Sequence, residues 1–197
     1  MWDTAYSAGA TPTWDIGRPQ PAVARLVAAG AFGAPGASVL DVGCGTGEHA
    51  LLLAGLGYRV VGVDVAPEAI RRACAKAAGR AAPELVVHDA LDLGSLGRTF
   101  DAALDIGLFH ALADDERPRY AASLAAAIRP GGRAFVLCWS DRNPFGFGPR
   151  RVTRREIRGT FRAAAGWRVE DIEADELASR LPVERIQAWL VRLARRG

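Results

Sequence analysis

Apolar runs of strand length alternate along this chain with alanine-rich segments in which apolar residues recur at helical spacing. The strand-like runs lie at residues 38–42, 59–63, 85–87, 100–104 and 134–139. Helical patterns follow three of them, at 46–54, from Pro67 towards Gly79, and from 114 to 129. Strands that alternate with helices in this way predict an α/β fold with a largely parallel sheet.

The two ends of the chain depart from this alternation. After a helix expected near residues 153–165, a strand near 167–172 and a last apolar run at 186–193 are expected to pair as a hairpin at the sheet edge. Near the other end, Pro19 and Pro21 open a further helical pattern.

Three aromatic residues, Trp2, Tyr6 and Trp14, lie in the segment before that helix, which glycine, proline and threonine interrupt. These aromatics either plug the core from below or form a lid over a site at the carboxyl ends of the strands.

Composition and charge narrow the possible classes of protein. The chain has 197 residues, of which 50% are hydrophobic, which is enough apolar material for one substantial core. Basic residues number 25 against 22 acidic ones, and this excess is too small and too scattered to indicate a nucleic-acid partner. Arginines 150, 154, 158 and 162 recur every four residues, which on a helix predicts one basic stripe, either solvated or attractive to an acidic partner.

Other features bear on the compartment and on metals. No apolar stretch reaches the ~18 residues that a membrane span needs, and the N-terminus lacks the pattern of a signal peptide, so a cytoplasmic location is expected. The three cysteines form no C-x-x-C pair and show no zinc spacing with the three histidines. We therefore expect core thiols and no metal.

The glycine-rich stretch after the first strand carries the strongest functional signal. Gly43, Gly45 and Gly47 stand at every second position, which allows a sharp turn and lets a ligand lie against bare backbone. A dinucleotide site would need its third glycine at position 48, which is Glu48. This carboxylate, together with Asp41 before the turn, favours a cationic or zwitterionic ligand over a diphosphate.

Acidic residues also end the next two strands. Asp64 ends the second strand, where a carboxylate accepts hydrogen bonds from the hydroxyls of a ribose. Asp89 and Ala90 follow the third strand, where a carboxylate suits the exocyclic amine of adenine. Together these strand ends predict a site for an adenosine with an uncharged or positive appendage.

With these motifs the chain resembles the class I S-adenosylmethionine-dependent methyltransferases. Residues 39–48 resemble their glycine motif, Asp64 their ribose acid, Asp89-Ala90 their adenine contact, and residues 129–132 their turn into the fifth strand. The resemblance implies a single doubly wound, Rossmann-like domain with a mostly parallel seven-stranded sheet, an antiparallel last strand and an N-terminal helical lid. In this scheme residues 1–36 form the lid segment and residues 37–197 the domain that binds S-adenosylmethionine.

The N-terminal run Trp14-Asp15-Ile16-Gly17-Arg18-Pro19 resembles the entry of the thiopurine, thiol and halide methyltransferase group, in which such a segment folds over the cofactor. Ile106 stands where the thiopurine branch carries an arginine, so the run 105–110 looks closer to the thiol and halide branch. The resemblance implies cofactor contacts at Trp14, Arg18, Asp41, Gly43, Cys44, Gly45, Gly47, Asp64, Val65, Asp89, Ala90 and Asp105.

Methyl transfer from a sulfonium is an in-line displacement, to which a protein contributes mainly by positioning and by excluding water. His110, just beyond the fourth strand, is either a general base, a substrate contact or a loop histidine. Tyr6 and Trp14 would enclose the sulfonium by cation–π attraction or act as core aromatics. The expected substrate contacts are Tyr6, Phe109, His110, Trp139 and Phe145.

These observations predict a small cytoplasmic methyltransferase that acts on a small molecule, at a thiol or another soft nucleophile. Two alternatives stay open: an O- or N-methyltransferase of secondary metabolism with His110 as base, and a cofactor-binding protein without activity. No nucleic-acid or membrane partner is expected, and the oligomeric state is expected to be a monomer or a weak homodimer.

Overall fold

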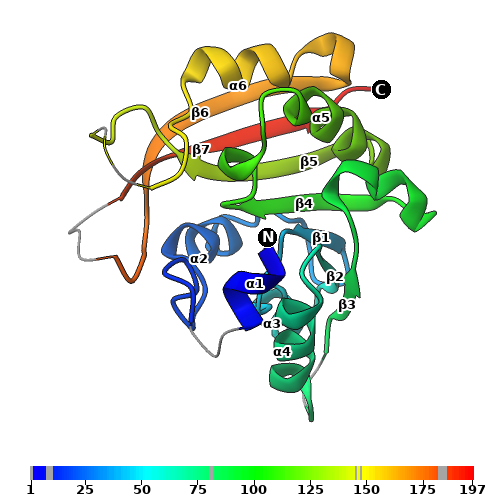
Figure 1. Ribbon diagram of the computed structural model, residues 1–197. Helices are drawn as coiled ribbons and strands as arrows, with labels where there is room; N and C mark the ends of the chain where they lie inside the picture. Colours follow the sequence, from blue (N-terminus) through cyan, green and yellow to red (C-terminus); the bar gives the residue numbers. More distant parts are fainter. Residues whose placement is uncertain (1, 8–10, 80–81, 145, 147, 182–185) are drawn as a thin grey trace.

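The computed structural model describes residues 2–7, 11–79, 82–144, 146, 148–181 and 186–197. Within these ranges seven strands form one sheet in the order β3-β2-β1-β4-β5-β7-β6 (Figure 1). The strands are β1 (Ser38–Val42), β2 (Arg59–Asp64), β3 (Glu84–Val87), β4 (Phe100–Ile106), β5 (Ile128–Trp139), β6 (Trp167–Leu177) and β7 (Ile186–Arg195). Strands β1 to β5 pair in parallel, whereas β7 is antiparallel to both β5 and β6. The mostly parallel sheet, its antiparallel last strand and the closing edge hairpin are confirmed.

Helices cover both faces of the sheet, as in a doubly wound fold (Figure 1). The α-helices are α1 (Trp2–Ser7), α2 (Pro21–Ala28), α3 (Glu48–Gly55), α4 (Pro67–Ala77), α5 (Glu116–Ala127) and α6 (Arg154–Thr160). Short 3₁₀ segments are η1 (Ala90–Leu96), η2 (Phe109–Ala111) and η3 (Ala163–Ala165). In the described part of the chain, none of the helices has the length and apolar character that crossing a bilayer requires.

Two apolar layers form because successive side chains of a strand point to opposite faces of the sheet. In β1, Val39 packs in the layer with α2 and α3, whereas Leu40 and Val42 pack in the layer with α5 and α6. The sheet is therefore buried on both faces, and its carboxyl-terminal edge is where a ligand can approach the backbone.

The pairing register brings the carboxyl ends of the parallel strands to one edge. Val42 at the end of β1 lies opposite Val63 in β2 and Asp105 in β4, and Asp64 lies opposite Val87 in β3. The loops that follow these four strands consequently meet at the same place.

Strand β5 begins at Ile128, earlier than expected, and helix α5 ends before residue 129. Phe100 pairs with Ile128 and pairing resumes between Ala102 and Arg133, so residues 129–132 form a bulge within the strand. A Cβ atom on Gly132 would lie 2.6 Å from Cγ2 of Ile128, so only glycine fits this tight bend. The expected turn is present, but it lies inside β5 instead of before it.

The expected basic stripe on one helix is wrong. Helix α6 is short: Thr153 caps its start, with Glu156 in a capping box, and the backbone leaves the helix at Phe161. Arg150 lies before the helix and pairs with Glu156 at 2.5 Å. The guanidinium of Arg154 stacks 4.2 Å from the centroid of the Trp189 ring. These arginines make separate local contacts.

Candidate active site

The turn between β1 and α3 is a tight backbone cradle. The amides of Gly43 and Cys44 both donate to the carbonyl of Val63, which pulls the turn against the end of β2. Gly43 has a φ of 69°, and a Cβ atom there would lie 3.0 Å from Cβ of Leu108. Gly45 has a φ of 53°. Such a turn lets a ligand lie against a main chain that carries no side chain at these glycines.

Cys44 contributes to this turn through its backbone and through its thiol, which donates to the carbonyl of Gly45 at 3.8 Å. Its side chain is buried against β2, where a Cβ atom on Gly62 would lie 3.1 Å from Cys44 Sγ. Burial raises the pKa of the thiol well above its usual range. Gly47, which precedes the first residue of α3, has a φ of 83°.

Asp64 ties the end of β2 to the glycine turn. Its two carboxylate oxygens accept hydrogen bonds from the amides of Gly45 and Ala66, both at 2.9 Å. Each oxygen keeps a further lone pair for a ligand hydroxyl. Burial raises the pKa of Asp64, and the neighbouring Val65 is 52% exposed.

Asp41 is a buried acid beneath the same turn, with 1% of its surface exposed. It accepts a hydrogen bond from the amide of Ala50, while its Oδ2 has no partner among the residues that the structure describes. Burial, with smaller contributions from the charges of Asp105 and Asp64, raises its pKa to about 7. An unpartnered buried carboxylate is costly, so a cationic ligand nearby would stabilise its ionised form.

Asp105 serves the loop that follows β4 and does not present its carboxylate to a ligand. One oxygen accepts the amides of Leu108 and Phe109, at 2.9 and 3.3 Å, and the other accepts the hydroxyl of Tyr120 at 2.7 Å. Burial raises the pKa of Asp105 to about 7. The expected side-chain contact between Asp105 and the cofactor is therefore not brought about by this geometry.

Phe109 likewise belongs to the core. It has no exposed surface, and its ring centroid lies 5.1 Å from that of Phe161. The guanidinium of Arg117 covers its ring at 5.0 Å. Phe109 holds the loop in place and is not brought to a surface that a substrate reaches.

Asp89 lies at the expected edge beside Asp64. It is exposed, and it caps η1 by accepting the amide of Leu91 at 2.8 Å. The amide of His88 donates to the carbonyl of Asp64 at 2.9 Å, which joins the two strand ends. Ala90, the first residue of η1, is partly buried beside them.

The N-terminal segment brings Tyr6 to the glycine turn. Tyr6 is 4% exposed and packs against Ala66, which precedes α4, and Ala69, which lies in the first turn of α4. Its hydroxyl would lie 3.1 Å from a Cβ atom on Gly45, so it contacts the turn closely. The indole of Trp14 donates to this hydroxyl at 3.0 Å.

The two predicted cofactor contacts in this segment, Trp14 and Arg18, are more exposed to solvent than Tyr6. Trp14 is 49% exposed and its ring lies edge-on to that of Trp2, with the centroids 5.9 Å apart. Arg18 is exposed.

His110 lies beyond β4 beside the end of β5. Its Nδ1 accepts the backbone amide of Trp139 at 3.2 Å, which leaves the ring proton of the neutral form on Nε2. Burial lowers the pKa of His110 to about 4, so the ring is neutral near pH 7. Trp139 is 4% exposed, under the guanidinium of Arg151. Phe145 lies outside the described residues.

The other two histidines make contacts within the fold. Nε2 of His49 accepts the amide of Gln20 at 3.2 Å, which joins α3 to the residue before α2. His88 contacts the carbonyl of Asp92 through Nε2 at 2.9 Å. Across the described ranges, no group of three or more His, Cys, Asp or Glu side chains is arranged to hold a metal ion.

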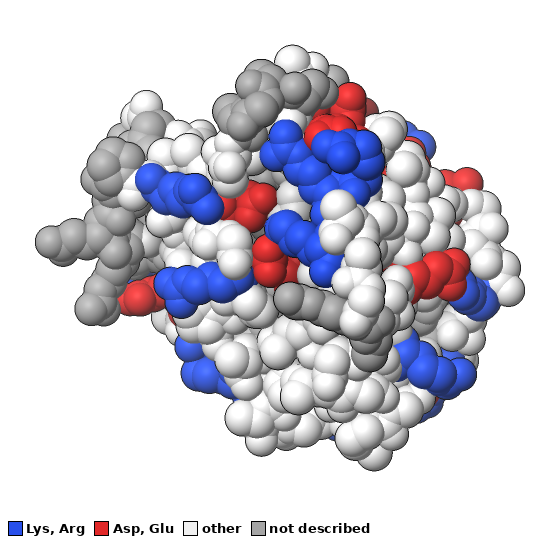
Figure 2. Space-filling view, turned by 90° about the horizontal axis from the view of Figure 1, so that it is seen from below, with Lys and Arg blue, Asp and Glu red and all other residues white. Residues whose placement is uncertain are grey.

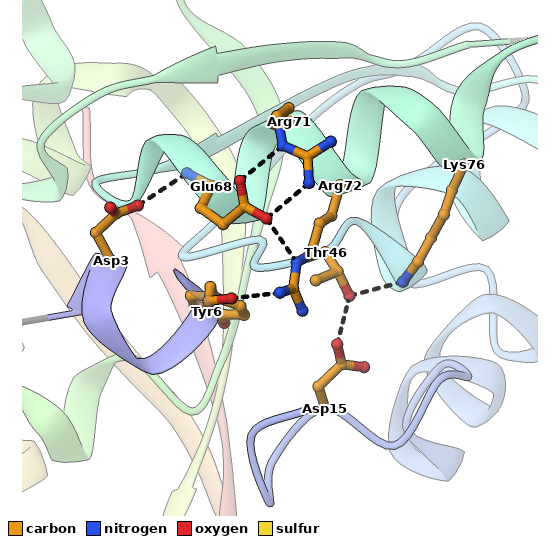
Figure 3. A network of polar contacts seen from close by, with 8 residues as sticks. All are labelled: Asp3, Tyr6, Asp15, Thr46, Glu68, Arg71, Arg72 and Lys76. Atoms are coloured by element: carbon orange, nitrogen blue, oxygen red, sulfur yellow. Dashed lines mark hydrogen bonds and ion pairs between the residues drawn. The ribbon is translucent and has the colours of Figure 1, made fainter. Parts of the chain in front are cut away.

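A polar network on helix α4 was not predicted from the sequence (Figure 3). It joins α4 to the N-terminal segment and to the glycine turn, and its members are Asp3, Tyr6, Asp15, Thr46, Glu68, Arg71, Arg72 and Lys76. Lys76 is the only lysine of the chain, and this is the one feature of the sequence that could have drawn attention to the network.

The network also corrects the interpretation of Glu48. Lys76 pairs with its carboxylate at 2.6 Å, so its charge is compensated and does not by itself repel phosphate. The acidic character of the site rests instead on Asp41 and Asp64.

Comparison with known proteins agrees with this geometry. A family described as "Methyltransferase domain" matches residues 39–132. The chain is 35% identical to a 2-heptyl-1-hydroxyquinolin-4(1H)-one methyltransferase of Mycobacteroides abscessus, over 85% of this chain and 74% of that protein. It is 29% identical to the probable thiol methyltransferase 2 of Arabidopsis thaliana, over 95% of this chain and 83% of that protein.

Solved structures share the fold and indicate the cofactor. One comes from work on the conversion of a disulfide bond into a thioacetal group during echinomycin biosynthesis. It superimposes with a TM-score of 0.86 at 36% identity, over 99% of this chain and 91% of that chain. Methyltransferases of this fold have been solved with S-adenosylmethionine or S-adenosylhomocysteine bound. The bare glycine turn and the uncompensated charge of Asp41 fit such a cation. The chain therefore belongs to the class I S-adenosylmethionine-dependent methyltransferases.

Proposed function

We propose that this enzyme methylates a thiol, or another nucleophile that ionises readily, on a small molecule. The observation that carries the proposal is the hydrogen bond from the Trp139 amide to Nδ1 of His110. It assigns the ring proton to Nε2, so the imidazole faces an acceptor as a hydrogen-bond donor and not as a base.

The chain offers a binding site for the cofactor. S-adenosylmethionine, when bound, supplies an electrophilic methyl group on a positively charged sulfur. Gly43 and Gly45 would offer bare backbone, Asp64 would accept hydrogen bonds from ribose hydroxyls, and Asp89 would accept one from the adenine amine. Asp41 would compensate the positive charge from beneath the turn.

The N-terminal segment would exclude water from the reacting groups. Tyr6 contacts the glycine turn, and Trp14 fixes its hydroxyl through the indole N–H. In this proposal residues 1–36 act as a cover for the domain formed by residues 37–197.

An acceptor without a base must lose its proton by itself. A thiol with a pKa of about 8.5 is already a few per cent thiolate at pH 7, and thiolates are intrinsically strong nucleophiles. An aliphatic alcohol is not ionised there and would need a base. The Nε2–H of His110 can hydrogen-bond a thiolate and hold it in line.

A second candidate acceptor follows from the relative of Mycobacteroides abscessus. That relative acts on a 1-hydroxyquinolone, and the hydroxyl of such an N-hydroxy heteroaromatic is far more acidic than that of an alcohol. The same site would serve it, because neither acceptor needs a base.

The proposal also covers the partners, the oligomeric state and the location of the enzyme. On the face that carries α1 to α4, acidic and basic side chains of the described residues interleave and form no one-signed patch of the kind that nucleic acid requires (Figure 2). We infer a cytoplasmic enzyme, a monomer or weak homodimer, without a nucleic-acid partner.

A transfer assay with methyl-labelled S-adenosylmethionine tests the proposed acceptor class. The panel contains alkyl and aryl thiols, an N-hydroxyquinolone, an alkyl alcohol and an alkyl amine, at one pH and one concentration. We expect labelled product from the thiols, with the N-hydroxyquinolone as the second-best class, and none from the alcohol. Preferred methylation of the alcohol or amine contradicts the proposal, as does tight binding of S-adenosylhomocysteine with no product from any acceptor.

A further inference from the structure

We propose that Arg72 and Lys76 of helix α4 are positioning residues that hold the N-terminal segment on the glycine turn and so set the rate at which the cofactor leaves. The inference rests on the proposed role of this segment as a cover. It adds which contacts keep the cover in place and what they control.

Two hydrogen bonds, one near each end of helix α1, join this helix to α4 (Figure 3). The carboxylate of Asp3 accepts the backbone amide of Glu68 at 2.9 Å. At the other end of α1, the guanidinium of Arg72 donates to the carbonyl of Tyr6. Glu68 holds Arg72 in this orientation through a bond of 2.9 Å to its Nε.

A second group of contacts fastens the following loop to the glycine turn. Nζ of Lys76 donates to the hydroxyl of Thr46 at 2.8 Å and to Glu48 at 2.6 Å. The Thr46 hydroxyl in turn donates to the carboxylate of Asp15 at 2.9 Å. Asp15 also accepts the amide of Gly17, so the loop is fixed on both sides.

These contacts determine where the Tyr6 hydroxyl lies. Helix α1 has only six residues and would not hold its own position in water. Its direct tie to Arg72 leaves from the backbone of Tyr6, whose hydroxyl lies against Gly45. Loss of that tie would free the tyrosine ring to leave the turn and open the path of the cofactor.

The adjacent arginine provides a matched control. Arg71 also binds Glu68, at 2.6 Å, but its side chain is 69% exposed and no bond joins it to the described part of the N-terminal segment. Replacement of Arg71 therefore removes the same charge from the same helix and the same partner, and leaves the tie to Tyr6 intact.

The experiment compares Arg72→Met with Arg71→Met and follows release of S-adenosylhomocysteine by stopped-flow tryptophan fluorescence. Trp2 and Trp14 lie in the cover and report its movement. We expect release from Arg72→Met to be about tenfold faster, the factor for one charged hydrogen bond. Arg71→Met should stay within about twofold.

Further variants separate positioning from general damage. Arg72→Lys, which keeps a charged donor, should recover part of the wild-type rate. Lys76→Met should accelerate release as well, and the melting temperature of the ligand-free variants should stay close to that of the wild type. Higher salt should accelerate release from the wild type more than from Arg72→Met.

Equal release rates from Arg72→Met and Arg71→Met would overturn the proposal, as would an unchanged rate in Arg72→Met. The assay needs no methyl acceptor, so its outcome is independent of the acceptor panel. Absence of S-adenosylhomocysteine binding to the wild type would instead overturn the cofactor site on which both proposals rest.

Discussion

Two buried acids near the glycine turn make stability depend on pH. Burial raises the pKa of Asp41 and of Asp105 to about 7, from 3.8 when each is exposed. Between these values the folded state binds more protons than the unfolded state, so its stability falls as the pH rises. The ligand-free protein should therefore lose stability between pH 7 and pH 8, above the range in which the lowered pKa values of His49 and His110 act in the opposite direction. A cationic ligand should oppose this loss.

Asp41→Asn tests whether the charge of Asp41 lowers the stability of the ligand-free protein and strengthens the binding of a cationic ligand. The amide has the shape of the acid without its charge, so at pH 8 it should raise the free energy of unfolding of the ligand-free protein by about 1 kcal/mol. It should weaken S-adenosylmethionine binding about tenfold more than binding of the uncharged thioether S-adenosylhomocysteine. Thermal unfolding and calorimetry measure the two effects. Equal weakening of both ligands would show that the charge of Asp41 does not recognise the sulfonium.

His110→Asn tests the proposed donor role of the imidazole. The amide oxygen can take over the bond from the Trp139 amide, but an amide cannot accept a proton as a base. We expect turnover of a thiol acceptor to fall no more than about fivefold, the value of one hydrogen bond. Loss of a general base would cost about 10²–10⁴-fold. A fall of that size with unchanged S-adenosylhomocysteine affinity would restore His110 as the base.

The sequence predicts the position of some site residues and not of others. Asp64 was predictable because it ends a strand, and strand ends converge at one edge of a parallel sheet. Phe109 was misplaced because a loop aromatic beside a site and one that turns into the core have the same local sequence. Arg72 and Lys76 were not predictable as anchors, because their partners lie 66 and 30 residues away in the chain.

At the level of elements, the strands follow from continuous apolar runs, and their order agrees with the expected architecture. The predicted elements are wrong where tertiary contacts override the local sequence pattern. Proline and glycine at 129–132 predict a turn that stops a helix, yet strand pairing continues on both sides of it. The spacing of the arginines predicts a long helix, but the backbone leaves α6 at Phe161, whose ring packs in the core.

In the whole molecule, the sheet brings the glycine turn, Asp64 and Asp89 together, while contacts with α4 and with Thr46 hold the N-terminal segment beside them. The alternation of strands and helices predicts the first arrangement. The docking of a short, weakly patterned helix depends on side chains distributed over the chain, so its contacts required the structure. Binding and enclosure are therefore supplied by different parts of the molecule.

In the proposed reaction the enzyme methylates an acceptor that ionises without help from a base. The most direct test of this proposal is the pH dependence of kcat/KM at saturating S-adenosylmethionine, with two acceptors. One is an aryl thiol that is fully ionised at pH 6, and the other is a cysteine derivative with a pKa of about 8.5. We predict a flat profile for the aryl thiol and, for the cysteine derivative, a rise that levels off near its own pKa. An inflection at the same pH for both acceptors would place the proton transfer on the enzyme and contradict the account.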